Sequence, residues 1–237
     1  MKQDNEDVLQ QAKNALMDAK TIAWLQEKTK DFGKLMTYYR CAMMEIETKF
    51  NVLNEEFSLE HDRNPINSIK TRLKSVPSIR EKLERRNIAL SLAAVEENLS
   101  DIAGVRVICS FVDDVYVLAH ALLQQDDVEL IEKKDYIASP KPNGYRSLHL
   151  IVGIPIFLKH EKRIMKVEIQ LRTIAMDFWA SLEHQLRYKK DFLFSNEMAK
   201  ELQECAELSA VLDSRMDNLR KSVSGSDDKQ QKNKKSV

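Results

Sequence analysis

The stretch that decides how this chain folds is Asp135-Tyr-Ile-Ala-Ser-Pro-Lys-Pro-Asn-Gly-Tyr-Arg-Ser-Leu-His149. Two prolines hold the backbone φ angle at about −65° on either side of Lys141, and Asn143-Gly144 is a turn dipeptide. The loop should therefore be stiff and should display the lysine. Such a loop suits anion binding, although a hairpin loop with an exposed lysine would look the same in isolation.

Beyond the turn, apolar and polar residues alternate as in a strand with two different faces. One face carries Tyr145, Ser147 and His149, and the other carries Leu148, Leu150 and Val152. We expect the second face to pack in a core, which leaves the first face to meet a ligand.

The same alternation recurs along the middle of the chain, flanked by helical patterns. Strands are predicted at residues 105–111, 128–131, 145–156 and 163–172, and helices at 6–28, 30–58, 78–86, 113–125, 174–189 and from Met198 to Leu219. Ser78 is the expected N-cap of the short helix, with Glu81 as its capping-box partner. The polar composition of residues 222–237 predicts a disordered tail after a single domain over residues 1–221.

Composition restricts the class of protein. A chain of 237 residues with 43% hydrophobic residues can bury one well-formed core. The net charge is zero, so no general attraction to nucleic acid or to a membrane surface is expected. Three cysteines without paired spacing, no apolar run of about 18 residues and no signal peptide predict a cytoplasmic protein with reduced thiols.

A local basic cluster lies within this neutral chain. Between Lys70 and Arg86 there are seven basic residues and only two acids. Arg72 and Lys74 share a side if the chain is extended, and a helix N-terminus at Ser78 would place Lys82 one turn further on. This arrangement predicts a phosphate site. For Arg85 and Arg86, an exposed helix with glutamate–arginine pairs explains the charges equally well.

Two carboxylates occupy positions where a strand would normally avoid them. Glu168 shares one face of its strand with Lys166, Gln170 and Arg172, which is typical of the wall of a site. Asp101 directly precedes a buried strand, and Gly104 would allow that strand to bend. Carboxylates from neighbouring strands can hold Mg²⁺, although Asp101 is also explained as a helix cap or turn residue.

Four ordered segments together resemble the motif set of (p)ppGpp synthetases. They are Arg72-x-Lys74-x-x-x-Ser78, Asp101-Ile-Ala-Gly-Val-Arg106, the stretch from Asp135 to His149, and the run from Glu168 to His184. The sequence is most similar to the small alarmone synthetases of the RelA/SpoT family, in the RelP branch. The resemblance implies an α+β fold, with a mixed five-stranded sheet flanked by helices and related to nucleotidyltransferases.

The resemblance also implies an activity and a role for each site residue. The enzyme would move the β,γ-pyrophosphate of ATP to the 3′-hydroxyl of GTP or GDP in the stringent response, with AMP as the other product. The implied ATP ligands are Arg72, Lys74, Ser78, Lys82 and Arg106, with Arg72 and Arg106 flat on the adenine. The implied guanine-nucleotide ligands are Lys141, Asn143, Tyr145 and His149, with Tyr145 stacked on the base. Asp101 and Glu168 would bind Mg²⁺, and Glu168 is the better candidate for the general base.

Two other functions fit parts of the same pattern. Nucleotidyl transfer to RNA on a related fold would release pyrophosphate rather than AMP, and a nucleotide-sensing module would need no catalytic carboxylates. The resemblance implies a homotetramer, and the apolar stripes of the long terminal helices predict contact with another chain. The preference for GDP or GTP and the regulation of activity do not follow from the sequence. A chain of this length has no room for the hydrolase and regulatory domains of long relatives.

Overall fold

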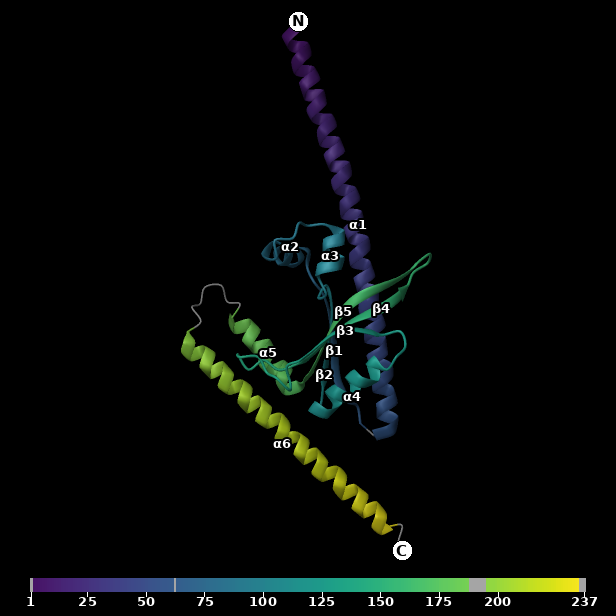
Figure 1. Cartoon of the computed structure of the whole chain (residues 1–237), viewed down its shortest axis with the longest axis vertical. Helices are drawn as coiled ribbons and strands as arrows, with labels where there is room; N and C mark the ends of the chain where they lie inside the picture. Colours follow the sequence, from purple (N-terminus) through teal and green to yellow (C-terminus); the bar gives the residue numbers. More distant parts are fainter. Residues whose placement is uncertain (1, 62, 188–194, 235–237) are drawn as a thin grey trace.

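A five-stranded sheet with the order β1-β2-β5-β4-β3 forms the centre of the protein (Figure 1). Its strands are β1 (Ile66–Leu73), β2 (Ala103–Cys109), β3 (Glu129–Asp135), β4 (Leu148–Phe157) and β5 (Lys162–Thr173). β2 and β5 are parallel, and every other neighbouring pair is antiparallel. This sheet confirms the predicted α+β class. The strand expected from Tyr145 begins only at Leu148, because the preceding residues form the turn.

Six helices surround the sheet. They are α1 (Lys2–His61), α2 (Val76–Arg85), α3 (Leu92–Asn98), α4 (Val112–Leu123), α5 (Ile174–Arg187) and α6 (Asn196–Lys234). The computed structural model describes the backbone of residues 2–61, 63–187 and 195–234, and the side chains of residues 30–59, 63–186 and 195–223. In these parts, no helix is both long enough and apolar enough to cross a bilayer.

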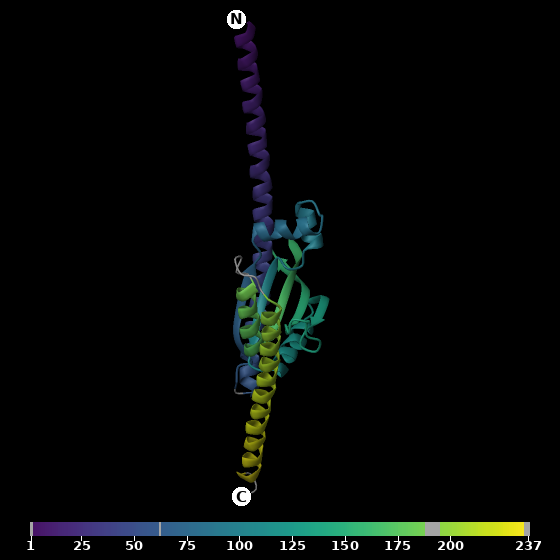
Figure 2. The ribbon, with the colours of Figure 1, turned by 90° about the vertical axis from the view of Figure 1, so that its left-hand side faces the viewer.

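The helices cover the two faces of the sheet unequally. α1 packs against β1, β2, β4 and β5, and α4 packs on the same side against α1 and β5. α6 returns beside α5, and the free ends of α1 and α6 extend beyond the sheet in opposite directions (Figure 2). The face opposite α1 therefore keeps its polar side chains near solvent.

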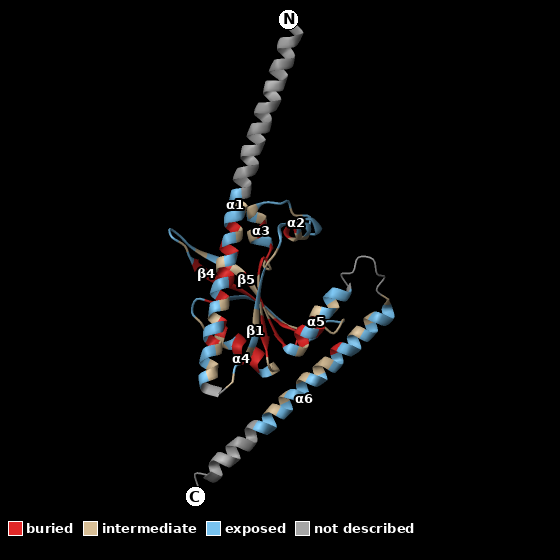
Figure 3. Ribbon diagram, turned by 180° about the vertical axis from the view of Figure 1, so that it is seen from behind, coloured by how far each residue is buried: buried red, intermediate tan, exposed pale blue. Residues whose placement is uncertain are grey.

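α1 is one continuous helix where the sequence predicted two. Its described stripe from Tyr39 to Leu53 is buried against the sheet, as the red residues in Figure 3 show. The sheet of the same chain covers this part of the stripe. The contact of the terminal helices with another chain stays a prediction. The alanine-rich stripe predicted over residues 6–28 lies outside the described side chains.

Phe50 gives a direct test of this packing because it is 0% exposed on α1. Phe50→Asp should lower the free energy of unfolding by about 4 kcal/mol or more, since it removes a buried ring and buries a charge. Thermal denaturation followed by circular dichroism measures the loss. Val52→Asp is the matched control on the same helix, because Val52 is 60% exposed. Equal melting temperatures for the two variants would contradict the packing.

Three further predictions differ from the structure. The N-cap of α2 is Ser75, whose side chain accepts a hydrogen bond from the Ser78 backbone N–H, so Ser78 lies within the first turn. Helix α6 continues to Lys234, although polar composition predicted disorder from Ser222. The sequence pattern also predicts that Phe178, Trp179, Leu182 and Leu186 pack from α5, but of these only Trp179 is buried. Trp179 is 5% exposed, whereas Phe178 is 65% exposed.

Candidate active site

A row of polar side chains crosses all five strands on the open face of the sheet. The strand registers align Lys70 with Arg106, Arg106 with Gln170, Gln170 with His149, and His149 with Lys134. On the three central strands, the intervening residues, such as Val107, Leu150 and Ile169, are buried in the apolar core on the α1 side of the sheet. The fold thus gathers charges from distant parts of the sequence onto one surface, as the alternation predicted.

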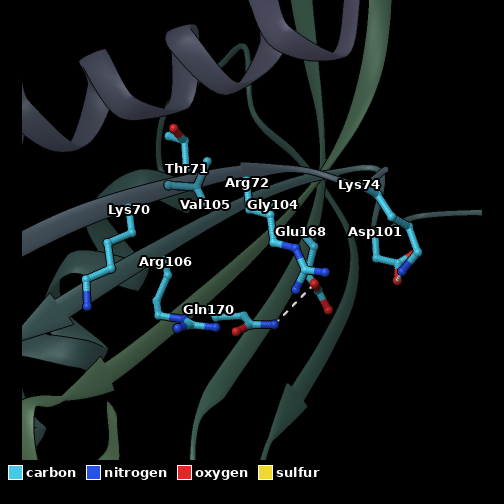
Figure 4. A pocket seen from close by; sticks show the side chains of 10 residues that line it. All are labelled: Lys70, Thr71, Arg72, Lys74, Asp101, Gly104, Val105, Arg106, Glu168 and Gln170. Carbon is cyan, nitrogen blue, oxygen red and sulfur yellow. Dashed lines mark hydrogen bonds and ion pairs between the residues drawn. The ribbon is translucent and has the colours of Figure 1, made fainter. Parts of the chain in front are cut away.

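The first cavity lies over β1, β2 and β5 (Figure 4). Its lining residues are Lys70, Thr71, Arg72, Lys74, Asp101, Gly104, Val105, Arg106, Glu168 and Gln170. Gly104 pairs with Arg72 on one side and with Glu168 on the other, so the missing side chain leaves the floor of the cavity open. The register of β2 with both neighbouring strands is unbroken at Gly104, where the sequence would have allowed a bend.

A second cavity lies beside the first, toward β3 and β4. Its lining residues are Lys82, Arg86, Ser100, Asp101, Glu132, Lys134, Tyr136, Lys141, His149, Ile151 and Glu168. Asp101 and Glu168 are the two residues that line both cavities. Two ligands bound in the two cavities would therefore meet at these carboxylates.

Asp101 is held by two of the predicted phosphate ligands. Its Oδ2 accepts from Lys74 Nζ at 2.8 Å and from Lys82 Nζ at 2.7 Å. Burial raises the pKa of Asp101, but the two lysines outweigh it and hold the pKa below its ordinary value. The carboxylate is therefore ionised at neutral pH.

Two buried polar atoms in the first cavity lack a hydrogen-bond partner. Among the described side chains, these are Asp101 Oδ1 and Arg106 Nε. Leaving buried polar atoms unpaired costs free energy, so they are suited to receive a ligand. A free carboxylate oxygen beside a second carboxylate fits a hard cation such as Mg²⁺, which takes its other ligands from water and phosphate. No group of three potential metal-ligating histidine, cysteine, aspartate or glutamate residues occurs in the described parts of the chain.

Glu168 projects from β5 between the two cavities. Gln170 Nε2 donates to its Oε2 at 3.2 Å, and His149 Nδ1 lies 3.6 Å from its Oε1. Burial raises the pKa of Glu168, but the neighbouring His149 and Gln170 hold the pKa below its ordinary value. Glu168 can therefore accept a proton or bind a cation at neutral pH.

The predicted turn presents Lys141 to the second cavity. The Gly144 N–H donates to the Lys141 carbonyl at 2.8 Å, with Gly144 at a φ of 87°. The Lys141 ammonium lies 4.5 Å from the ring centroid of Tyr136 and 4.8 Å from that of Tyr145. A side chain at Gly144 would also collide with the Cβ of Ala206 on α6. The glycine is thus required by both the turn and the helix.

The two cavities contain eight of the eleven predicted site residues. The first holds Arg72, Lys74, Arg106 and both carboxylates, and the second adds Lys82, Lys141 and His149. Three residues line neither cavity. Ser78 Oγ lies against Ser75, Asn143 Nδ2 contacts Glu183 Oε1 at 3.3 Å, and the Tyr145 hydroxyl lies 2.7 Å from His149 Nε2.

Sequence reasoning gave no role to several lining residues. Tyr136 stands inside the deciding stretch beside Asp135, and its neighbour Lys134 lies in the polar row. Gln170 shares its strand face with Glu168, which was a usable signal. For Lys134 the sequence offered none, because its position depends on which strand β3 pairs with.

Comparisons with known proteins identify the family. The model described as a region found in RelA / SpoT proteins matches residues 71–192. GTP pyrophosphokinase YwaC of Bacillus subtilis (strain 168) is 43% identical over 199 residues, which cover 84% of this chain and 95% of YwaC.

Two crystal structures from Bacillus subtilis have the same fold. Small alarmone synthetase 2 aligns with a TM-score of 0.74 and 42% identity, covering 81% of this chain and 99% of that one. Small alarmone synthetase 1 bound to its product pppGpp also aligns with a TM-score of 0.74, at 36% identity over 82% of this chain and 98% of that one. The family expectation from the sequence is thus confirmed: the chain belongs to the RelA/SpoT family and is one of its small alarmone synthetases.

Proposed function

We propose that this protein is a GTP pyrophosphokinase, which transfers the β,γ-pyrophosphate of ATP to the 3′-hydroxyl of GTP or GDP and releases AMP. The observation that carries the proposal is that Asp101 and Glu168 line both cavities. Direct transfer between two nucleotides requires two adjacent sites with the reacting groups at their junction. The named activity of YwaC and the product bound to small alarmone synthetase 1 support this assignment.

The first cavity is the proposed ATP site. Arg72 and Arg106 supply planar guanidinium groups that can lie against adenine. Lys74 and Lys82 supply point charges for the phosphates, and Ser78 lies in the first turn of α2 beside them. The two lysines are paired with Asp101 in the present structure. When a nucleotide binds, they would exchange part of this pairing for phosphate oxygens.

Asp101 and Glu168 are the proposed Mg²⁺ ligands. The bound ion would neutralise negative charge on the transferred pyrophosphate. Glu168 is the proposed general base, because it is ionised and stands where the second cavity meets the first. It would accept the proton of the 3′-hydroxyl as that oxygen attacks the β-phosphorus and AMP leaves.

The second cavity and its loop form the proposed guanine-nucleotide site. Lys141 and His149 line this cavity, and Asn143 and Tyr145 belong to the same loop. The Lys141 ammonium occupies the space over the Tyr145 ring, so it would move aside or cover the base when guanine stacks there. Tyr136 adds a second ring on the other side of this ammonium.

Tyr145→Ala tests the stacking. Loss of the ring should raise the KM for GTP or GDP by about 5- to 100-fold, since base stacking contributes roughly 1 to 3 kcal/mol. The KM for ATP, measured in the same assay, serves as the internal control and should change by less than about twofold. Equal increases for both substrates would instead assign Tyr145 to the scaffold.

Nucleotidyl transfer to RNA is the enzymatic alternative. Incubation with ATP, Mg²⁺ and either GTP or GDP, followed by anion-exchange chromatography, separates the two. We expect AMP to form only when the guanine nucleotide is present, in equal amount to a new guanosine derivative. Release of pyrophosphate, or formation of AMP from ATP alone, would contradict the proposal. A pure sensing module would give no product. We also propose a cytoplasmic location, where both ATP and GTP are abundant.

We also propose that the protein is a homo-oligomer, and a tetramer by family resemblance. Among the described residues, both α5 and α6 carry large apolar side chains that are exposed. They include Phe178, Leu182, Leu186, Leu208, Leu212, Met216 and Leu219, each at least 40% exposed. An apolar surface that spans two helices is typical of an interface between subunits.

A double substitution on α6 tests this surface. Leu212→Glu with Leu219→Glu should reduce the mass measured by light scattering at micromolar concentration, because two charges would enter the apolar interface. Val117→Glu is the matched control, since Val117 is an exposed apolar residue on α4. A parent protein with a mass near the 27.5 kDa of one chain would contradict the proposal.

A further inference from the structure

Two chains of polar side chains run from Arg172 to Glu168. In the first, Arg172 Nη2 donates to Gln170 Oε1 at 2.8 Å, and Gln170 Nε2 donates to Glu168 Oε2 at 3.2 Å. In the second, Arg172 Nη2 donates to the Tyr145 hydroxyl at 2.6 Å, which lies 2.7 Å from His149 Nε2. His149 Nδ1 then faces Glu168 Oε1 at 3.6 Å. Each oxygen of Glu168 thus faces a group whose position depends on Arg172.

The direction of both chains follows from the chemistry of their two ends. The guanidinium has only donors. The ionised carboxylate of Glu168 has only acceptors, so the proton of neutral His149 belongs on Nδ1, which faces it. His149 Nε2 is then an acceptor and takes the O–H of Tyr145, whose oxygen accepts from Arg172. In the other chain, the amide oxygen of Gln170 faces Arg172 and its NH₂ group faces Glu168. Every donor is therefore oriented toward the carboxylate.

Arg172 reaches the proposed substrate sites only through Tyr145 and Gln170. It lines neither of the two cavities, and its side chain is only 5% exposed. Asp177, in the first turn of α5, holds Nη1 at 3.3 Å, and Ser147 Oγ lies 3.4 Å from Nε. The guanidinium is thus fixed by α5 on one side and by the residue before β4 on the other.

A buried arginine is costly, because taking a charge out of water is offset only by good pairing. An apolar side chain would fill the same space in the fold at no such cost. An apolar residue cannot donate hydrogen bonds to Tyr145 and Gln170, which begin the two chains that lead to Glu168. The donors, rather than packing, are therefore the reason to keep an arginine here.

We propose that Arg172 is a positioning residue for Glu168: anchored by Asp177, it orients the groups that face both oxygens of that carboxylate. The inference rests on the proposed function, in which Glu168 is the general base, and goes beyond it by naming the residue that aligns the base. Positioning acts on the reacting geometry more than on substrate binding. Loss of Arg172 should therefore lower kcat and leave both KM values nearly unchanged.

Arg172→Lys is the decisive variant, because lysine keeps the positive charge but has a single ammonium group. That group cannot make all four contacts of the guanidinium, which are to Tyr145, Gln170, Asp177 and Ser147. We expect kcat to fall about 10- to 100-fold with each KM within about threefold of the parent. Arg163→Lys is the matched control. It makes the same change near the other end of β5, where Arg163 pairs with Glu96 outside both cavities. Its kcat should match that of the parent.

Tyr145→Phe keeps the ring and removes only the hydroxyl that links Arg172 to His149. The single variant should lower kcat about 3- to 30-fold. In the double variant with Arg172→Lys, the loss of the hydroxyl should lower kcat by less than about a further twofold, because the link from Arg172 to His149 is already broken. A residue that merely stabilises the fold would give independent effects. If Arg172→Lys does not fold, Tyr145→Phe and Gln170→Leu, which breaks the other chain, decide the question.

The outcomes separate this inference from the proposed function. A parent protein that forms no AMP would overturn the proposed function and this inference with it. With an active parent, a normal kcat in Arg172→Lys would overturn the positioning role alone, as would normal values in both Tyr145→Phe and Gln170→Leu. An increase in KM without a loss of kcat would make Arg172 a substrate ligand instead.

Discussion

Replacement of Glu168 by glutamine should lower kcat by about 1000-fold or more. The amide keeps the size of the side chain but can neither accept the 3′-hydroxyl proton nor give Mg²⁺ an anionic ligand. The side chain is part of the cavity wall rather than the core, so the melting temperature should stay close to that of the parent. Initial rates of AMP formation at saturating ATP and GTP measure the effect.

Glu96→Gln provides the matched control, because Glu96 also pairs with a basic side chain but lies on α3 outside both cavities. It should keep full activity. If Glu168→Gln were to retain more than about a tenth of the parent kcat, Glu168 could be neither the general base nor a metal ligand.

Asp101→Asn should separate catalysis from binding. The structure pairs Asp101 with Lys74 and Lys82, so the substitution removes one negative charge and leaves both lysines free for phosphate. We expect kcat to fall by about 100- to 1000-fold, since Mg²⁺ loses a ligand. The KM for ATP should stay the same or decrease. Steady-state kinetics with Mg²⁺ and ATP varied separately measure both parameters, and the Mg²⁺ needed for half-maximal rate should rise.

Asp113 offers a closely matched control for this charge removal. Its Oδ2 also contacts two cations, Arg220 at 2.8 Å and Lys221 at 3.3 Å, but on α4 away from the cavities. Asp113→Asn should leave kcat and the Mg²⁺ requirement unchanged. A large increase in the KM for ATP in Asp101→Asn, with a normal kcat, would mean that Asp101 only orders the two lysines.

Local pattern was sufficient to predict most of the sheet. Alternation located β2, β4 and β5 because one face of each is buried on the α1 side, and that burial forces a period of two. β1 was not predicted, since half of its residues are exposed and few are apolar. Alternation could not identify neighbours in the sheet. The pairing of Gly104 with Glu168 depends on β2 lying parallel to β5, which brings together residues that are 64 positions apart (168 − 104). The junction of the two cavities was therefore visible only in the structure.

The helix boundaries show a different limit. The sequence has a serine at positions 75 and 78, and either can cap a helix. Pro77 favours the earlier cap, because proline is over-represented in the first turn of a helix. For α6, composition predicted disorder, yet the helix continues through that region, with an i, i+4 contact between Lys200 and Glu204 near its start. Amino-acid composition indicates whether a segment can bury apolar surface in a core. A helix that remains exposed to solvent does not depend on such burial.

The candidate site was predictable residue by residue but not as an arrangement. Charged residues such as Arg72 and Glu168 stand out in the sequence because they lie in strand patterns. Burying a charge costs free energy unless a ligand or another residue pairs with it. Side chains that act through others leave no such signal. Arg172 has the same parity as Glu168 on β5, and only the structure shows that it is buried and directed at Tyr145.

The most direct test of the central claim, that two nucleotides react across the shared carboxylates, is to follow the phosphates of ATP. The protein is incubated with Mg²⁺, GTP and ATP labelled either at the α-phosphate or at the β-phosphate, and the nucleotides are separated by chromatography. Transfer across Asp101 and Glu168 predicts that the β label appears only in the guanine nucleotide, on its 3′-oxygen, and that the α label remains in AMP. An α label attached to any acceptor, or a β label released as free pyrophosphate, would contradict the account.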